Sequence, residues 1–486
     1  MKKSFLKYIF TGGLLILLAG CEKSITLNPT HSASLENAFK TISDFETGLS
    51  SIYNSMRDVG YYGRNLSVLP DMSTDNLVQT TESLVNFLEI TDWLYTPQNG
   101  TVAETWLGCY RIINNANIII NNIDKFSSPA NQKQANRIKG QALAARALVH
   151  FDLLRYFGEN FDRNSTSLGI HYKKTSVLEE SPVATKPSRQ SVKQNYDDIY
   201  ADLNAARTLL SDIDAPVNTG AKYKIDLVGL SAIYARVALY AKDWPIAISN
   251  STTVINALPL ASRSVYPSIW KDQSNSEVAF AVFFSSGEFL SRLAGDVFSG
   301  PINRSQFEGN PTLFATFDEA NDIRFPTSVA RGYGTLANPV RNSSRLVVTK
   351  FLGKSALIDG VVDWKAFRTG EMYLIRAEAY ANTPGQEASG LADLNTLRAA
   401  RINGSVNGSE TGAALIAAIA TERRKELFME GHRWFDLKRT TRTIDRVSIT
   451  APTTSVLLAP GRREWVWPIP QGERDANSSM QQNTGY

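Results

Sequence analysis

The sequence predicts a mainly α-helical protein, a scaffold of helical repeats that carries long irregular insertions and a few short strands. In several long segments, apolar residues recur at steps of three and four, which is the spacing of one helix face. Two regions, 60–105 and 260–365, break this pattern and are rich in Gly, Pro, Asn, Ser and aromatic residues. Irregular segments of this length in a compact protein commonly carry function, so a binding site is expected there.

The first strong helical signal covers residues 139–158. Its large apolar residues fall on one stripe of an α-helix: Leu143, Ala147, Phe151 and Leu154. Gly158 follows and suits the end of a helix. His150 falls near the same stripe, so we expect a hydrogen-bonded core histidine there rather than a metal ligand.

The second signal is a pair of helices that begins at Leu227. The apolar face of the first helix consists of Leu227, Leu230, Tyr234, Val237, Ala241 and Trp244. Pro245 suits the first turn of the second helix, which Pro259 ends. With small residues where its helices meet, the pair resembles a tetratricopeptide unit, and the predicted fold is a tetratricopeptide-like α–α superhelix. Further helical segments are predicted at 106–123, 192–210, 371–382 and 388–401, and short strands at 278–284 and 346–351.

The N-terminus predicts an exported protein that is anchored to a membrane. Three lysines precede an apolar stretch, and the run Leu18-Ala19-Gly20 leads to Cys21. Together these features describe a secretory signal over residues 1–20, and the stretch is shorter than the roughly 20 apolar residues that span a bilayer. Cys21 looks like the acylated cysteine of a bacterial lipobox. The alternative is an ordinary signal peptide with a chance cysteine.

The rest of the chain divides into a tether and two helical regions. Residues 21–34 are polar and lack periodicity, which is typical of a lipid-anchored tether. Residues 35–260 form the predicted N-terminal helical repeat region, and residues 261–486 form the predicted C-terminal region with loop insertions. No later segment predicts a membrane span, so the chain after Cys21 is expected to be soluble.

Composition excludes several classes of protein. Of the 486 residues, 43% are hydrophobic and 20% are charged, which is typical of a globular protein and not of a disordered one. The formal net charge is only +4 and no basic block or stripe stands out, which argues against nucleic acid as a partner. If Cys21 carries lipid, Cys109 has no intramolecular partner, so no disulfide is expected.

The sequence contains no familiar catalytic or metal-binding pattern. A G-x-S-x-G elbow, an H-E-x-x-H helix, a C-x-x-C pair and a phosphate-binding glycine loop are all absent. The four histidines lack ligand-like spacing. The run 71–76 lacks the glycine and the distal glutamate of a calcium loop, and we expect a turn and helix cap there. The protein is therefore expected to be no enzyme and to hold no cofactor or metal.

The most specific stretch lies near the C-terminus, at residues 422–439, and reads ERRKELFMEGHRWFDLKR. The helix EMYLIRAEAY at 371–380 precedes it, and WPIPQGE at 467–473 and QNTGY at 482–486 follow it. In this order and spacing, the segments resemble the SusD/RagB family of Bacteroidetes nutrient-binding lipoproteins of the outer membrane. The lipobox agrees. Ser478 and Thr484 are mild departures, since they stand where the family often has proline.

The resemblance covers nearly the whole mature chain and implies a function. A protein of this kind would be lipid-anchored in the outer membrane and exposed at the cell surface. It would bind a nutrient oligomer, most simply a glycan, and deliver it to a SusC-like TonB-dependent transporter. Two alternatives from other classes stay open at this point. One is an exported lipoprotein that hydrolyses glycans, and the other is a repeat-based assembly protein without a small ligand.

The charged C-terminal motif is interpreted as a structural latch and not as a site of chemistry. On a helix, Arg423 and Glu426 lie on neighbouring turns and can pair, and Gly431 suits a left-handed helix end. Arg433 and Asp436 are expected to satisfy one another or nearby backbone. The predicted latch consists of Arg423, Arg424, Glu426, Glu430, Gly431, Arg433, Trp434 and Asp436.

Aromatic residues in the irregular insertions are the predicted ligand platforms, because sugar rings present apolar C–H faces. Polar groups that converge in a concavity would fix the hydroxyl groups. A tryptophan in a long loop can equally fill a small local core, and Trp244, Trp434 and Trp467 are assigned to the core. The candidates for ligand contact are Tyr61, Tyr62, Trp93, Tyr95, Asn99, Trp270 and Tyr333.

Overall fold

The structure is a computed structural model of the chain. It describes residues 38–80, 83–84, 86–176, 186–211, 222–285, 295–299, 304–331, 345–354, 360–446 and 456–486. The predicted signal (1–20), the tether with Cys21 (21–34) and the ligand candidate Tyr333 lie outside the described residues.

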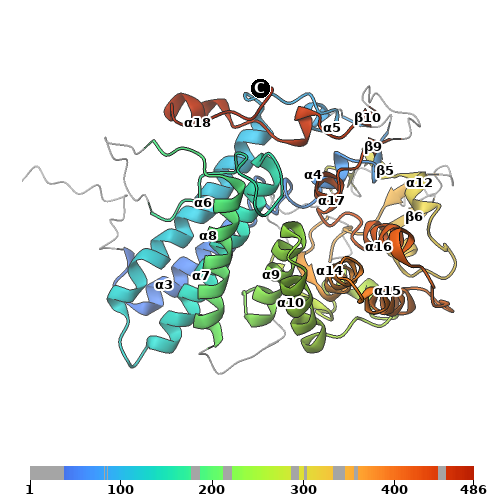
Figure 1. Ribbon diagram of the computed structural model, residues 1–486, viewed down its shortest axis with the longest axis horizontal. Coiled ribbons are helices and arrows are strands. Elements are labelled where there is room, and N and C mark those ends of the chain that lie inside the picture. Colours follow the sequence, from blue (N-terminus) through green and yellow to red (C-terminus); the bar gives the residue numbers. More distant parts are fainter. Residues whose placement is uncertain are drawn as a thin grey trace, which may run out of the picture.

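Four long helices build the N-terminal part of the scaffold, on the left of Figure 1: α3 (Ile42–Ser55), α6 (Gly100–Asn122), α7 (Gln132–Phe157) and α8 (Val192–Ser211). α6 packs on α7, and α7 packs on α8. α7 ends before Gly158 as predicted, but it begins earlier than residue 139, because its first turns are mostly polar and give no stripe to detect.

Further helix pairs continue the scaffold. α9 (Leu227–Ala241) packs on α10 (Trp244–Ala257), α14 (Thr369–Ala381) packs on α15 (Glu387–Arg401), and α10 against α14 joins the two pairs. α16 (Gly412–Glu426) packs on α14, and α17 (Arg433–Arg439) and α18 (Gln471–Ala476) follow. Figure 1 shows α9 and α10 between the N-terminal helices and α14–α16. Each predicted helical segment is confirmed as a helix.

A small antiparallel sheet joins the two irregular insertions. Its order is β1 (Leu77–Gln79), β5 (Phe307–Gly309), β7 (Leu346–Val348) and β6 (Val329–Arg331). Since β1 belongs to the 60–105 region and the others to the 260–365 region, the two insertions lie side by side. Three two-stranded ladders complete the strands: β2 (Val278–Val282) with β8 (Trp364–Arg368), β3 (Phe298–Ser299) with β4 (Arg304–Ser305), and β9 (Ile444–Asp445) with β10 (Leu457–Leu458). Both predicted strands exist and end earlier than expected.

Single-turn helices shape the connections between these elements. They are α4 (Leu69–Met72), α5 (Leu88–Thr91), η2 (Ile123–Phe126), α11 (Tyr266–Ile269), α12 (Pro311–Phe314), α13 (Arg324–Ser328) and η3 (Arg463–Trp465). Within the described part of the chain, no helix has the length and apolar character needed to cross a membrane.

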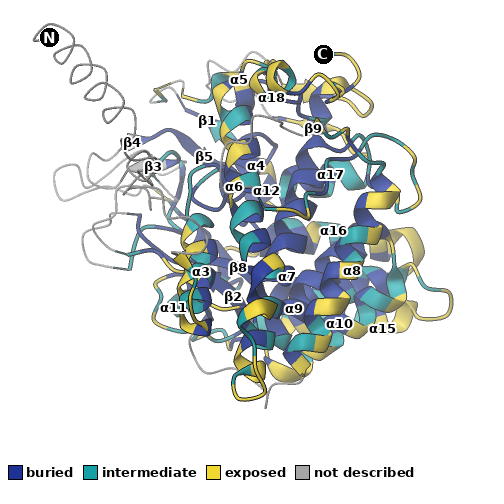
Figure 2. Ribbon diagram, turned by 90° about the vertical axis from the view of Figure 1, so that its left-hand side faces the viewer, coloured by how far each residue is buried: buried dark blue, intermediate teal, exposed yellow. Residues whose placement is uncertain are grey.

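Among the described residues, buried apolar side chains form two clusters. Figure 2 shows that the buried residues lie mainly on the inner parts of the ribbon and the exposed ones towards its outside. The large cluster draws residues from both sides of position 260, and the small one lies between α14, α15 and α16. Trp434 and Trp467 are core residues as predicted, whereas Trp244 is only partly buried against the large cluster. Cys109 is a buried free thiol.

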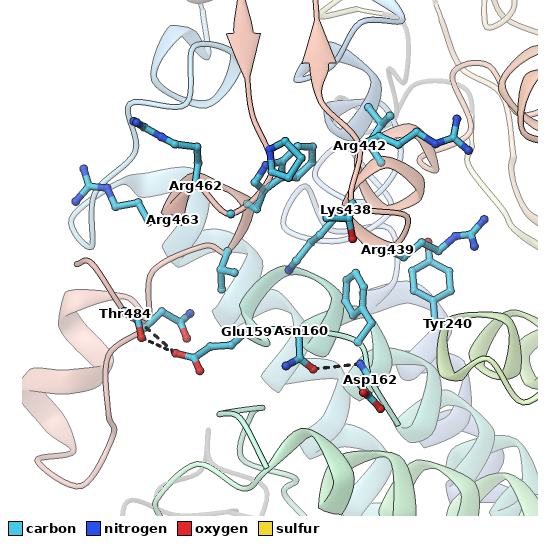
Figure 3. A pocket seen from close by; sticks show the side chains of 18 of the residues that line it. Glu159, Asn160, Asp162, Tyr240, Lys438, Arg439, Arg442, Arg462, Arg463 and Thr484 are labelled. Carbon is cyan, nitrogen blue, oxygen red and sulfur yellow. Dashed lines mark hydrogen bonds between the residues drawn. The ribbon is translucent and has the colours of Figure 1, made fainter. Parts of the chain in front are cut away.

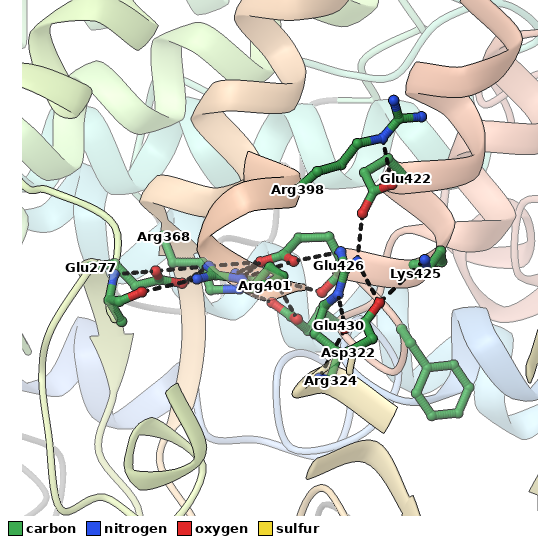
Figure 4. Close-up of polar contacts among 12 residues, drawn as sticks. Glu277, Asp322, Arg324, Arg368, Arg398, Arg401, Glu422, Lys425, Glu426 and Glu430 are labelled. Atoms are coloured by element: carbon green, nitrogen blue, oxygen red, sulfur yellow. Dashed lines mark hydrogen bonds and ion pairs between the residues drawn. The ribbon is translucent and has the colours of Figure 1, made fainter. Parts of the chain in front are cut away.

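A buried charge network connects elements of both clusters (Figure 4). At its centre, the Glu426 carboxylate binds Arg401 at 3.0 Å, Arg368 at 2.5 Å and Arg324 at 3.0 Å. Burial opposes ionisation of Glu426, but these guanidinium groups outweigh it and hold its pKa well below the ordinary value. Acidic and basic groups balance in the network, six against six: Glu277, Asp322, Glu410, Glu422, Glu426 and Glu430 face Arg324, Lys350, Arg368, Arg398, Arg401 and Lys425.

His150 is a hydrogen-bonded core residue, as predicted. Its Nδ1 donates to the Arg146 carbonyl at 2.9 Å, and its Nε2 accepts from the Lys173 N–H at 3.0 Å. These partners assign the neutral Nδ1–H tautomer. The ring stacks on Tyr172 with 3.7 Å between centroids. A second proton on Nε2 would point at the Lys173 N–H, and burial lowers the pKa of His150 well below its usual value.

This histidine should make the protein less stable in mild acid. Below about pH 6.5, the unfolded chain binds a proton on this imidazole that the folded chain does not, so the free energy of unfolding falls as the pH falls. The slope from one such group is about 1.4 kcal/mol per pH unit. His150→Gln should therefore flatten the fall of melting temperature between pH 7 and pH 5, measured by calorimetry. His171→Gln, at a half-buried site, is the matched control and should change the slope less. If the melting temperatures of His150→Gln and of the wild type fell equally between pH 7 and pH 5, His150 would not be the cause of the acid sensitivity.

Candidate functional site

The structure places the predicted ligand platforms in the protein interior. Of their surfaces, the five aromatic candidates inside the described residues expose at most 6%, and Asn99 exposes 8%. A ring that stacks on a sugar must offer a face to solvent, so these six side chains are not open platforms in this conformation. They are Tyr61, Tyr62, Trp93, Tyr95, Trp270 and Asn99.

Each of these side chains has an evident structural partner. Trp93 donates from Nε1 to the Ser73 carbonyl at 3.0 Å, with the Arg446 guanidinium 4.3 Å from its ring centroid. Trp270 carries the Lys350 ammonium 4.0 Å from its ring centroid. Two further contacts tie the insertions to the scaffold, since the Tyr61 hydroxyl donates to Asp152 at 2.5 Å and the Tyr95 hydroxyl donates to the Glu464 carbonyl.

The six candidate residues do not come together in one site. Only Tyr61 and Tyr62 touch one another, with ring centroids 4.2 Å apart. Asn99 caps α6, where its Oδ1 accepts from the Val102 N–H at 3.1 Å. The insertions look irregular in sequence because their strands are short, yet they bury their aromatic residues as a regular domain does.

Residues 71–76 bind the C-terminal motif. The Asp71 carboxylate accepts hydrogen bonds from the N–H groups of Met429 at 3.0 Å and Gly431 at 3.2 Å. Gly431 has φ 75°, and a Cβ there would lie 2.4 Å from the Leu66 carbonyl oxygen, so only glycine fits. Burial raises the pKa of Asp71 to about 6, although these donors favour its charged form. The predicted turn is thus one half of a latch.

The ion pairs of the motif differ from those expected from helix spacing. Arg433 binds both oxygens of Asp75 at 2.7 Å instead of pairing with Asp436. Asp436 accepts from Arg423 at 2.8 Å, because α17 folds back across the end of α16, and Glu426 turns to the buried charge network instead. The motif therefore connects segments that are distant in sequence, where local pairs had been expected.

An open cleft of about 770 Å³ lies beside the motif, where the loop after α7 meets the ends of α9 and α17 and the C-terminal tail (Figure 3). Its volume falls within the range of small-molecule sites. Pro460 and Val466 supply apolar surface, while Asn160 and Thr484 supply hydrogen-bonding groups. Phe161 and Trp465 reach the cleft only by their edges, because they expose 8% and 6% of their surfaces.

Lys438 occupies the floor of the cleft and supports the helix behind it. Its Nζ donates to the carbonyl oxygens of Arg155 at 2.8 Å and Gly158 at 3.2 Å, at the C-terminal end of α7, where a positive charge is favourable. The ammonium lies 4.7 Å from the Phe161 ring centroid. Burial and then the charge of Arg155 lower the pKa of Lys438 to about 7.

The acidic side of the cleft is held by local hydrogen bonds. Glu159 accepts from the Thr484 hydroxyl at 3.0 Å and so ties the tail to the loop. Asn160 accepts from the Asp162 N–H at 3.1 Å, and Asp162 accepts from the Asn164 N–H at 3.0 Å. The loop is therefore ordered before any ligand arrives. Across the described ranges, no three His, Cys, Asp or Glu side chains cluster as metal ligands would.

Comparison with known proteins decides the family. A profile of the SusD family matches residues 353–486, and one described as "Starch-binding associating with outer membrane" matches residues 30–237. Together they match more than two thirds of the chain. The chain belongs to the SusD/RagB family.

SusD-like relatives match this chain over almost its whole length and over almost their own. The SusD-like proteins P38 and P2 of Formosa agariphila are both 24% identical, over 97% and 100% of this chain and 96% and 100% of their own. Among solved structures, a SusD superfamily protein from Bacteroides thetaiotaomicron has a TM-score of 0.79 at 24% identity, covering 91% of this chain and all of its own. A SusD-like carbohydrate binding protein from Bacteroides vulgatus has a TM-score of 0.78 at 23% identity, over 91% and 98%. These structures confirm the fold.

Sequence reasoning missed the cleft of this SusD-family protein. Three of its walls are short stretches at or next to helix ends: 159–164, 240–242 and 460–463. The available signals were the polar run that follows Gly158 and the basic end of the motif itself, whose residues Lys438 and Arg439 line the cleft (Figure 3).

Substitution of Trp93 should reduce stability. Trp93→Ala removes a buried ring and should lower the free energy of unfolding by about 3–5 kcal/mol, measured by denaturant titration. The next residue, Leu94, is 57% exposed, so Leu94→Ala is a matched control that should change it by less than about 0.5 kcal/mol. An unchanged stability for Trp93→Ala, with ligand binding lost, would instead restore this residue as a platform.

Proposed function

We propose that this SusD-family protein is a lipid-anchored lipoprotein of the outer membrane. In this proposal it captures a nutrient oligomer, most simply a glycan, and delivers it to a SusC-like TonB-dependent transporter. The observation that carries the binding role is the open cleft of about 770 Å³, which is lined by polar and basic side chains and by apolar surface. Family membership supports the outer-membrane setting, since one matching profile is described as associating with that membrane.

The chemistry of the cleft suits a carbohydrate. Sugar rings need apolar contact for their C–H faces and convergent donors and acceptors for their hydroxyl groups. Pro460 and Val466 offer the first, since Pro460 is exposed and Val466 is half-buried, and Phe161 and Trp465 add only ring edges. Asn160, Asp162 and Thr484 offer the second on a loop and a tail that already hydrogen-bond among themselves. Ordered groups of this kind lose little conformational entropy on binding.

Binding without turnover is the expected behaviour. The full chain in mild detergent, titrated by calorimetry with a panel of plant, fungal and host oligosaccharides, should give saturable binding to at least one class. Chromatography of the same mixtures should show no shortened products. Glycan hydrolysis requires a pair of carboxylates, and Glu159 and Asp162 both line the cleft. Products that vanish in the variant with Glu159→Gln and Asp162→Asn would establish the hydrolase alternative instead.

The membrane anchor has its own test. Several acyl chains on Cys21 would give stable attachment, since each buried CH₂ contributes about 0.8 kcal/mol. Cys21→Ser should therefore move the protein from the membrane fraction to the soluble fraction after cell lysis. Cys109→Ser changes a buried thiol and is the matched control, which should stay with the membrane. Membrane retention of Cys21→Ser would remove the lipoprotein assignment.

A further inference from the structure

The cleft beside α17 is strongly basic. Its walls carry two acidic side chains, Glu159 and Asp162, against seven basic ones: Arg163, Lys242, Lys438, Arg439, Arg442, Arg462 and Arg463. Figure 3 shows the basic residues of α17 and of the 460–463 segment opposite Glu159 and Asp162. The net charge of the whole chain is only +4, so this imbalance is local.

Internal ion pairs neutralise only part of this charge. Arg163 binds Asp197 at 2.6 Å, and Arg439 binds Glu378 at 2.6 Å, so these two are already paired. Lys438 is engaged by main-chain carbonyl groups, which carry no net charge.

The other four basic side chains of the lining are solvent-exposed: Lys242, Arg442, Arg462 and Arg463. Arg462 and Arg463 share the single carboxylate of Glu464, at 3.3 and 3.4 Å, and Arg463 also donates to the Gly485 carbonyl at 2.5 Å. Lys242 and Arg442 are exposed, and neither makes an ion pair with any carboxylate among the described residues. A ligand can therefore reach Lys242 and Arg442 without breaking an internal ion pair.

Arg442 lies near charges of both signs. Partial burial of its side chain and then the charges of Arg433 and Arg439 lower the pKa of its guanidinium, and the carboxylates of Asp436 and Glu378 oppose this shift. An incoming anion would reduce the repulsion among the three guanidinium groups. Guanidinium groups bind planar or tetrahedral oxyanions through paired N–H donors, which gives geometric selection as well as energy.

From this geometry we propose that the cleft selects acidic oligosaccharides, whose sugars carry carboxylate or sulfate groups, over neutral ones. The inference rests on the proposed carbohydrate-binding function and names the substrate class for the same site. Lys242 and Arg442 contact the anionic groups from one side, and Arg462 and Arg463 contact them from the other. The apolar side chains of Pro460 and Val466 contact the sugar rings between them.

The test compares one sugar backbone with and without its charge. An oligogalacturonate and its fully methyl-esterified counterpart are titrated by calorimetry into the full chain in mild detergent. We expect the acidic form to bind at least about tenfold more tightly. A second pair, a sulfated oligosaccharide and its desulfated form, distinguishes a sulfate preference from a carboxylate preference, and tighter binding of the charged member of either pair supports the proposal.

Variants locate the effect in the cleft. The double variant Lys242→Gln and Arg442→Gln should lose at least about tenfold in affinity for the acidic ligand and keep its affinity for the neutral one. Arg111→Gln removes a 61% exposed cation from α6, away from the cleft lining, and is the matched control that should leave both affinities unchanged.

Several results would overturn the inference. Equal affinity for charged and uncharged partners in both pairs, a preference that survives the double variant, or an equal loss in Arg111→Gln would each do so. Competition by a short single-stranded DNA as effective as the oligogalacturonate would show a general polyanion surface and would also overturn it. Failure of every oligosaccharide to bind would overturn the proposed function itself, which distinguishes the two failures.

Discussion

The architecture depends on one buried carboxylate. Glu426 ends α16 and binds arginines from α13, from the end of β8 and from α15, so four elements that are far apart in the chain meet at two oxygen atoms. Moving charges out of water is costly, and such a site is stable only when every partner is present in good geometry. The equal numbers of acidic and basic groups around Glu426 meet that condition. The network therefore specifies how the helices assemble more than it adds stability.

The motif that carries Glu426 also connects the core to the surface. Its N-terminal end belongs to the buried charge network, its middle is held by Asp71 and Asp75, and its C-terminal end lines the cleft through Lys438 and Arg439. One short run of sequence thus fixes the N-terminal insertion and the cleft wall relative to each other. The helix α17 therefore belongs both to the latch and to the wall of the cleft.

The helices were predictable from sequence, whereas the contacts that organise them were not. Residues such as Leu143 and Phe151 repeat at the helical period, because the scaffold buries one stripe of each helix. Residues such as Trp93 and Trp270 belong to no periodic pattern. The sequence of an irregular segment does not indicate whether its aromatic residues are exposed or buried. The partner of Arg433 could not be found either, since Asp75 lies outside its helix and only tertiary structure brings the two together. The cleft escaped prediction for the same reason, as its walls come from five separate segments.

The contacts between the run 71–76 and the C-terminal motif have a consequence for how the chain acquires its structure. Asp71 and Met429 are 358 residues apart, as are Asp75 and Arg433. Proteins dominated by such non-local contacts have high contact order and fold slowly, because a long loop must close before its contacts form. During synthesis, the N-terminal helices emerge first and can pair locally, and Tyr61 of the insertion that follows α3 can already reach Asp152. The contacts of Trp93 with Arg446 and of Tyr95 with Glu464 must wait for the last part of the chain, so the insertion completes its packing only when the C-terminus has been made.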